Sequence, residues 1–343
     1  MTIASRSPDG AVAPPDDAAP ASRARAGSAR AVALLQRQGV LVALVVVCTF
    51  GLLRYESFAT ADNLLNILRQ NSMLGLVALG TTFVILTGGI DLSVGALVAV
   101  AGVAAAMTSG SGAFAAIAAG VATAAGLGLV NGLLIAKLRL QPFIVTLAML
   151  IAARGAVLAV TGEESVRVER DTEGLLWLGR GMVGPLPLPV IVLVAAYAAG
   201  SFVLRYTPYG RHVYAVGDNE EAARLLGLNV DRVLVATYTL SGALAGLAGV
   251  VLAARLGAGQ PVAGAGWELD AIAAVVVGGT LLTGGQGGAG STLLGILLLG
   301  VIFNLFNLEG TMTPWWQWIL RGGFLLGVVI VQSRMLRAAE RRA

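Results

Sequence analysis

The chain has 343 residues, of which 57% are hydrophobic and only 12% are charged, and its formal net charge at pH 7 is +4. Soluble domains carry about 25% charged residues, so this composition excludes a large soluble enzyme, a disordered protein and a nucleic-acid-binding protein. Cys48 and Lys137 are the single examples of their residue types. A lone cysteine excludes an internal disulfide, and a lone lysine followed by Leu138 excludes an ATP-binding P-loop. We predict a polytopic membrane protein with no metal or cofactor.

The first 37 residues are rich in Ala, Pro, Ser, Asp and Arg and have no sustained apolar period, which predicts a disordered tail over 1–37. After this tail, a bilayer core about 30 Å thick requires about 20 apolar residues per helix. Runs without charge, extended where their flanks stay apolar, therefore predict membrane spans at 38–53, 70–90, 92–136, 140–162, 181–204, 233–254, 271–308 and 314–333.

Two of these runs are long enough for two helices each. Run 92–136 contains the turn-forming stretch Ser109–Gly112, and run 271–308 is interrupted at Thr283–Gly288. The prediction is an all-α polytopic membrane protein with about ten transmembrane helices. Its membrane domain covers 38–333, and residues 334–343 form a C-terminal tail.

The basic residues lie in a few loops and tails, as they do on the cytoplasmic side of membrane proteins. Both terminal tails are rich in Arg, and an even number of spans places both inside. Ten spans also place Lys137, Arg139 and the loop 205–232 inside. The acidic stretch 163–173 falls outside, as do Glu268 and Asp270. The distribution of charged residues and the predicted number of spans therefore indicate the same topology, with both termini in the cytoplasm.

The tetrapeptide Leu86–Gly89 recurs as Leu282–Gly285, each copy following an apolar span. Internal duplication is common in transporters, whose binding sites lie where glycine breaks a helix at the repeat interface. Chance recurrence is the alternative, because the chain contains 46 glycines. We predict a duplication, with helices broken at the glycine-rich motifs.

Asp91 is the single acid that follows the uncharged run 70–90. Ionisable groups at membrane depth are costly and commonly functional. Capping of the next helix by Asp91 or Ser93 is the interpretation that the local pattern favours, and direct contact with a substrate or ion is the alternative. Gly88 and Gly89 favour a broken helix whose N–H groups could face a polar ligand.

Arg154 and Arg321 interrupt apolar spans. In the predicted topology both lie in the outer part of their spans. We expect them to extend to the membrane interface, with pairing inside the helix bundle as the alternative.

The loop 205–232 has the pattern of a short helix that is capped at both ends. Asp218 or Asn219 can cap the N-terminus, and Gly227 can end the helix in a left-handed conformation. The first turn holds Glu220 and Glu221, where a helix N-terminus favours negative charge. The helix would also display Leu225 and Leu226 to a partner's groove. A solvated loop helix is the alternative.

Three segments then resemble one family. The loop from Gly210 through Gly227 is similar to the coupling loop of ABC-importer permeases, and Thr87–Gly95 and Trp267–Thr280 resemble hallmarks of the ribose-type monosaccharide branch. The resemblance covers about 35–333. Asp218 stands where the family pattern leads us to expect a small residue, and the loop 163–173 is unusually charged.

This resemblance implies the transmembrane permease subunit of an importer in the bacterial inner membrane. A cytoplasmic ATP-binding subunit would hydrolyse ATP, an extracytoplasmic binding protein would deliver a ribose- or xylose-like sugar, and a second permease copy would complete a homodimer. The permease would perform no covalent chemistry. Contact with the ATP-binding subunit would fall on Glu220, Glu221, Ala222, Ala223, Arg224 and Gly227.

Polar and aromatic residues near apolar spans suit a hydroxyl-rich ligand. The predicted substrate pathway comprises Gly88, Gly89, Asp91, Ser93, Asn131, Phe143 and Asn304. Within the same class, a permease for branched-chain amino acids or nucleosides is the alternative. An ion-coupled secondary transporter would need more acids at membrane depth, and an intramembrane enzyme would need a catalytic set that the sequence lacks.

Overall fold

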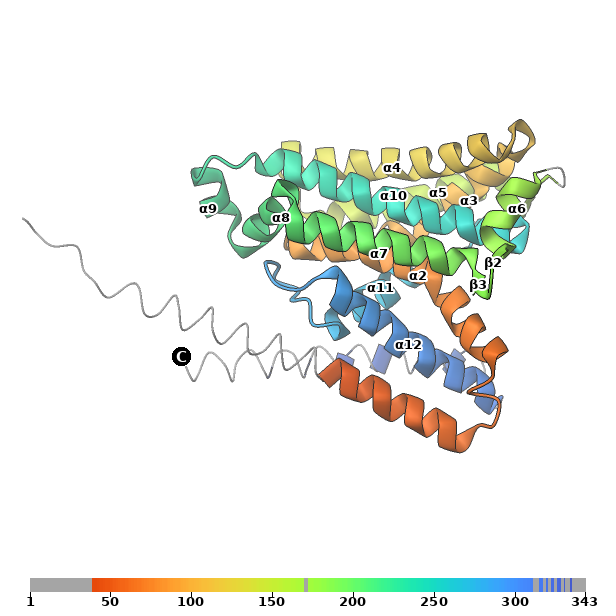
Figure 1. Ribbon diagram of the computed structural model, residues 1–343. Coiled ribbons are helices and arrows are strands. Elements are labelled where there is room, and N and C mark those ends of the chain that lie inside the picture. The colour runs from red at the N-terminus through yellow and green to blue at the C-terminus, as the bar shows by residue number, and fades with distance from the viewer. Residues whose placement is uncertain are drawn as a thin grey trace, which may run out of the picture.

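The computed structural model describes residues 39–169 and 172–310, and beyond them only positions 315, 316, 319, 322, 323, 326, 327, 330 and 334. The predicted tails 1–37 and 334–343 lie almost wholly outside these residues, as do Arg321 and most of the last predicted span. In Figure 1 the long helices run between two ends of the molecule. Helices α8 (Pro208–Asp218) and α9 (Glu220–Leu225) lie at one end, and α6 (Glu173–Arg180) lies at the other.

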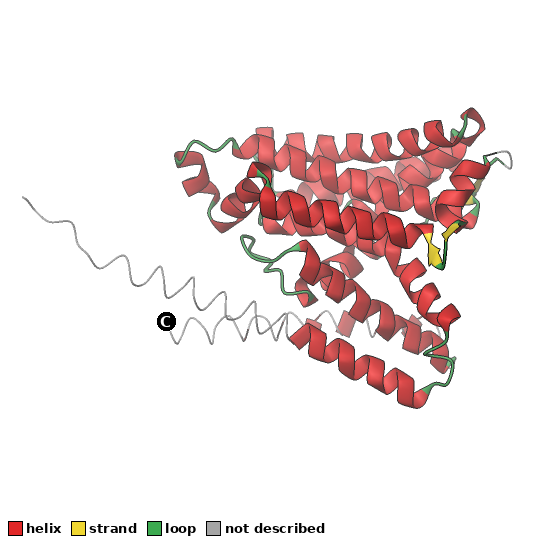
Figure 2. Cartoon of the chain, in the orientation of Figure 1, coloured by secondary structure: helices red, strands yellow, loops and turns green. Residues whose placement is uncertain are grey.

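The described residues are mainly helical, as predicted (Figure 2). An unlabelled helix, Gly39–Arg54, precedes α2. The long helices are α2 (Ala61–Leu86), α3 (Val94–Met107), α4 (Ala113–Leu138), α5 (Pro142–Thr161), α7 (Leu188–Tyr206), α10 (Val230–Leu256), α11 (Trp267–Val277) and α12 (Ala289–Glu309). A 3-10 turn, η1 (Ser109–Ser111), joins α3 to α4. The remaining elements are four two-residue strands in two antiparallel pairs: β1 (Val166–Arg167) with β4 (Ala258–Gly259), and β2 (Met182–Val183) with β3 (Leu186–Pro187).

Five of these helices are long and apolar enough to cross a membrane: α4, α5, α7, α10 and α12. The helix Gly39–Arg54 and α3 are shorter apolar helices. The chain is therefore a polytopic helical membrane protein. Helix α2 begins at Ala61, well before the predicted span at 70, because the uncharged run marks the apolar section of the helix and not its capped start. The Thr60 hydroxyl accepts a hydrogen bond from the Asn63 N–H.

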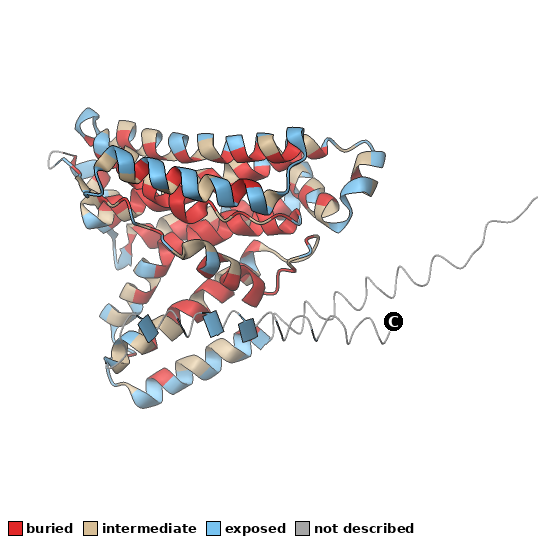
Figure 3. Ribbon diagram, turned by 180° about the vertical axis from the view of Figure 1, so that it is seen from behind, coloured by how far each residue is buried: buried red, intermediate tan, exposed pale blue. Residues whose placement is uncertain are grey.

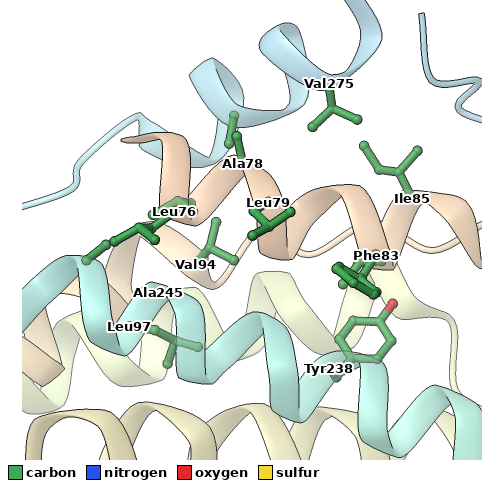
Figure 4. Close-up of a cluster of buried hydrophobic side chains, with 14 of the residues drawn as sticks. Leu76, Ala78, Leu79, Phe83, Ile85, Val94, Leu97, Tyr238, Ala245 and Val275 are labelled. Carbon is green, nitrogen blue, oxygen red and sulfur yellow. The ribbon is translucent and has the colours of Figure 1, made fainter. Parts of the chain in front are cut away.

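Helix α10 is the centre of the fold and packs most extensively against α4, then α3 and α2. Side chains on α2 and α10 are buried against each other, and Figure 4 shows Tyr238 of α10 pointing toward Phe83 of α2. The buried residues of Figure 3 are concentrated where these helices meet, whereas Gly39–Arg54 is mostly exposed. A buried apolar centre with exposed apolar outer faces is the pattern expected of a helix bundle surrounded by lipid.

Two helix breaks occur at the predicted glycine-rich motifs. The chain leaves helical conformation between α2 and α3, over 87–93, and between α11 and α12, over 278–288. The break between α2 and α3 is largely buried: Asp91 and Ser93 have no exposed surface, and Gly88 is its one exposed residue. Backbone that is not helical at such a position needs partners inside the protein for its polar groups, and these partners define the site described below.

Arg154, which we expected to extend to the membrane interface, is half-buried and makes hydrogen bonds within the protein. Its guanidinium donates hydrogen bonds to the carbonyl oxygens of Pro261 at 2.6 Å, Ala263 at 2.9 Å and Gly95 at 3.2 Å. The side chain therefore ties α5 to the loop before α11 and to α3. Three carbonyl acceptors compensate for part of the cost of removing the charge from water, which makes the internal position favourable.

Candidate functional site

The two copies of the Leu-Thr-Gly-Gly tetrapeptide are in direct contact. The Gly285 N–H donates a hydrogen bond of 3.0 Å to the carbonyl oxygen of Leu86. Gly217, near the C-terminus of α8, lies against both segments, since a Cβ atom at Gly217 would lie 1.8 Å from the Leu86 oxygen and 2.6 Å from the Gly285 nitrogen. The hydroxyl of Tyr214 adds a 2.9 Å hydrogen bond to the Gly287 carbonyl. Helix α8 is therefore joined to both helix breaks.

Asp91 lies at the centre of a fully buried hydrogen-bond cluster. One carboxylate oxygen accepts from the Ser93 N–H at 3.0 Å and from the Ser93 hydroxyl at 2.6 Å, and the other accepts from the Ser241 hydroxyl at 3.0 Å. Ser93 is the N-cap residue of α3, but its side chain does not cap the helix. Asp91 instead forms a local turn with Ser93 and fastens it to α10.

Two further helices hold the same segment. The Asn131 amide on α4 donates to the Ser93 hydroxyl at 3.0 Å, and the Thr146 hydroxyl on α5 donates to the Ile90 carbonyl at 3.2 Å. Tyr238 on α10 presses against Gly89, because a Cβ atom there would lie 2.4 Å from its hydroxyl. The Asn131 carbonyl oxygen and the Tyr238 hydroxyl are buried without a hydrogen-bond partner among the described residues.

The predicted short helix in 205–232 is α9, and the preceding α8 makes the segment a pair of helices. Asn219 caps α9 by accepting from the Ala222 N–H at 2.9 Å, whereas Asp218 belongs to the end of α8. Gly227, two residues beyond α9, has a φ of +82°. The prediction of caps at both ends is therefore confirmed, with Asn219 as the N-terminal one.

Salt bridges fix α9 against the start of α10. Arg224 contacts Asp231 at 2.9 Å and Glu220 at 3.0 Å, and Lys137 at the end of α4 contacts Asp231 at 3.0 Å. The hydrogen bond to Asp231, followed by the one to Glu220, holds the pKa of Arg224 above its ordinary value. In contrast, Leu225 and Leu226 are 85% and 82% exposed. Helix α9 is therefore held by the Arg224–Asp231 salt bridge, and Leu225 and Leu226 leave an apolar surface exposed.

A cavity of about 610 Å³ joins α9 to the first helix break. Its lining comes from α9 (Glu220, Glu221 and Arg224), from the break itself and from the start of α5, with Tyr238 also present. The residues of the break that line it are Thr87, Gly88 and Gly89. A movement of α9 would therefore change the shape of a space that reaches the Asp91 segment.

The structure brings most of the predicted pathway residues together, but not all. Gly88, Gly89, Asp91, Ser93 and Asn131 form one cluster. Phe143 is 45% exposed in the first turn of α5, beside the cavity-lining Pro142.

Asn304 lies elsewhere, near the end of α12, and exchanges two amide hydrogen bonds with Asn63, at 3.1 and 2.7 Å. The sequence reasoning also missed three members of the Asp91 cluster: Thr146, Tyr238 and Ser241. They occur as isolated polar residues in apolar helices. Only the expectation that they lie on the buried face of their helix would have indicated them.

The fold and site are those of a polytopic transport protein with a hydrogen-bonded helix break linked to a surface helix pair. A family profile described as "Branched-chain amino acid transport system / permease component" matches residues 63–329, and the chain belongs to this permease family. Its members are transport components, so the chain is not an enzyme. No solved structure matches the chain.

Individual relatives cover almost the whole chain. It is 42% identical to the ribose import permease protein RbsC of Escherichia coli strain K12 over 306 residues, which is 88% of this chain and 95% of that protein. It is 42% identical to RbsC of Bacillus subtilis strain 168 over 303 residues, 88% and 94% of the two chains. It is 35% identical to the L-arabinose ABC transporter permease protein AraH of Azospirillum brasilense over 341 residues, 99% and 96% of the two chains.

Proposed function

We propose that this chain is the transmembrane permease subunit of an ABC importer for a ribose- or xylose-like monosaccharide. The observation that carries this proposal is the link from α9 through α8 to both helix breaks, in a chain whose relatives are named for ribose and arabinose import. A separate ATP-binding subunit hydrolyses ATP, and an extracytoplasmic binding protein delivers the sugar.

The proposed orientation places the α8–α9 end in the cytoplasm of a bacterium and the α6 end outside the inner membrane. Basic residues at the first end support it: Lys137 and Arg139 lie at the end of α4, Arg224 lies in α9, and Arg232 lies in the first turn of α10. The acidic stretch that begins at Glu163 leads into α6 at the other end. This charge distribution corresponds to cytoplasmic termini and to ten spans, including the helix that the sequence predicts over 314–333.

The coupling surface is α9 and the turn after it. We assign the coupling to the ATP-binding subunit to Glu220, Glu221, Ala222, Ala223, Arg224 and Gly227. The exposed Leu225 and Leu226 support this assignment, because a pair of leucines displayed on a short, capped helix suits an apolar groove. Ala223 is buried and holds α9 against the bundle, so its contribution is to position the helix.

Coupling is mechanical. ATP binding to the partner subunit favours one of two permease conformations, and α9 and α8 carry the difference to Gly217. Because Gly217 lies against Leu86 and Gly285, a displacement of α8 must move both helix breaks or separate them. The sugar leaves past Gly88, Gly89, Asp91, Ser93 and Asn131, with Phe143 beside the exit.

The second proposed partner within the membrane is another copy of this chain. A homodimer with twofold symmetry would supply two equivalent coupling surfaces with one gene product. The mass of the solubilised permease without its ATP-binding subunits tests this part of the proposal. A mass of two chains is expected, and a single chain or a complex with a different permease would contradict it.

The experiment that tests the proposal is a co-purification from native membranes in mild detergent. We expect the tagged chain to retain an ATP-binding subunit and Glu221→Arg to lose it, because the substitution reverses the charge at the docking helix. Glu173→Arg is the matched control: it changes an exposed acid in the first turn of a short helix at the opposite end. Loss of the ATP-binding subunit from both variants, or from neither, would contradict the coupling assignment.

A further inference from the structure

A second cavity, of about 180 Å³, lies far from the coupling surface, where the α6-end portions of α2, α11 and α12 meet. These three helices all pack against one another. The cavity is lined by Asn66, Ile67, Gln70, Asn71, Leu74, Trp267, Asp270, Gly300, Phe303, Asn304 and Asn307. Five of its residues thus carry a carboxamide, which is an unusual concentration among apolar membrane helices.

The chemistry of this lining selects a neutral, hydroxyl-rich ligand. Each carboxamide offers both a hydrogen-bond acceptor and donors, so the set can match hydroxyl groups in either role. Trp267 and Phe303 add aromatic rings for the apolar faces of such a molecule. The described lining contains no Lys or Arg and contains the carboxylate of Asp270, which disfavours an anion. Its volume is below the roughly 300 Å³ at which pockets for drug-sized ligands begin, which limits the ligand to a small solute.

Helix adhesion is the rival explanation for amides between membrane helices, and it accounts for some of them. Asn71 donates to the Ile67 carbonyl at 2.7 Å and fills the space over Gly300, where a Cβ atom would lie 2.2 Å from the Asn71 nitrogen. Asn304 is paired with Asn63.

Adhesion does not account for Asn66 and Gln70. These two residues bond only to each other within α2, at 3.2 Å, among the described residues. That bond joins no second helix, and it leaves the Asn66 amino group and the Gln70 carbonyl for a ligand in the cavity.

We infer that this cavity is an entry subsite for a neutral monosaccharide, reached before the sugar passes the Asp91 segment. The inference rests on the proposed function, because it uses the orientation that places the α6 end toward the binding protein. Asn66 and Gln70 supply hydrogen bonds to hydroxyl groups, and Trp267 orients the sugar. A small set of neutral hydrogen bonds gives weak binding, which permits release toward the cytoplasm.

The test uses the complete transporter, with binding protein and ATP-binding subunits, in proteoliposomes supplied with D-ribose. Uptake of labelled sugar and ATP hydrolysis are measured together for Asn66→Leu and Gln70→Leu. Gln260→Leu is the matched control, because Gln260 follows β4 at the same end and does not line the cavity. We expect each cavity variant to lower uptake about fivefold while ATP hydrolysis stays within about twofold of wild type, and the control to keep both.

Three results would overturn the inference. Unchanged uptake in both cavity variants would show that the sugar does not use these amides. A parallel fall in uptake and ATP hydrolysis would assign them to assembly or coupling. An equal loss of uptake in Gln260→Leu would show that the effect is not specific to residues that line the cavity. Absence of ATP-dependent uptake by the wild-type complex would instead contradict the proposed function, so the two failures are distinguishable.

Discussion

Gly285 donates its backbone N–H to the carbonyl oxygen of Leu86 over 3.0 Å, which joins the two copies of the Leu-Thr-Gly-Gly tetrapeptide. A residue pair nearly two hundred positions apart in the chain thus connects two helix breaks at the same end of the bundle. Gly217 closes the contact from the side of α8. The repeat therefore has a structural role in linking the surface helices to the membrane core.

Gly217→Ala tests this link. The added methyl group would overlap the backbone of Leu86 and Gly285, which cannot move aside as a flexible side chain can. We expect destabilisation of about 2 kcal/mol and loss of ATP-driven uptake. Thermal unfolding of the purified protein and sugar uptake in cells are the measurements.

Gly126→Ala is the control for that variant, since nothing lies within 4 Å of a Cβ atom at Gly126 in α4. Alanine favours a helix interior by roughly 0.5–1 kcal/mol relative to glycine, so this variant should be as stable as wild type or more so. Equal behaviour of the two variants would show that the Gly217 contact has no special role.

Gly89→Ala is expected to impair transport through one specific overlap. Its Cβ atom would lie 2.4 Å from the Tyr238 hydroxyl. Tyr238→Phe removes this oxygen, and because the hydroxyl is buried without a partner among the described residues, its loss should cost little. We expect the double variant to recover much of the uptake that Gly89→Ala loses. Additive losses in the double variant would refute the assigned contact.

Substitutions of Asp91 distinguish a structural role, in which its carboxylate holds Ser93 and Ser241, from a role in ion coupling. Asp91→Asn keeps an oxygen that can accept from Ser93, whereas Asp91→Ala leaves the donors of Ser93 and Ser241 without their acceptor, at a cost of about 1–3 kcal/mol. We expect substantial uptake by the Asn variant and little by the Ala variant. An ion-coupling role requires the negative charge, so equal inactivity of both variants would support the secondary-transporter alternative.

The proposed orientation can be measured with single cysteines in a Cys48→Ser background. Arg167 and Asp218 are exposed and lie at opposite ends of the molecule, whereas Val168, next to Arg167, is buried and less suitable. In intact cells, a membrane-impermeant thiol reagent should modify Arg167→Cys rapidly and Asp218→Cys only after permeabilisation. The opposite pattern would invert the topology.

The sequence was a good guide to the helices because uncharged length and glycine-rich turns are local properties. It placed the breaks between α2 and α3 and between α11 and α12 within a few residues, and it recognised α9 from Asn219 and Gly227. It could not give the partners of Asp91, because Ser241 and Thr146 come from helices that are distant in the chain.

The hydrogen-bond acceptors of Arg154 could not be predicted either, because the Pro261 and Ala263 carbonyl groups belong to a loop far along the chain. The second cavity was also invisible in the sequence except for Asn304. Its amides lie on α2 and α12, and only the packing of these two helices against each other and against α11 assembles the lining.

ATP hydrolysed by another subunit drives monosaccharide transport through this chain. The most direct measurement is D-ribose accumulation in proteoliposomes that contain the permease and its ATP-binding subunit, with sugar-loaded binding protein outside and ATP inside. We expect accumulation that requires both ATP and the binding protein and that is unaffected by a Na⁺ or H⁺ gradient. Accumulation driven by an ion gradient without ATP would contradict it.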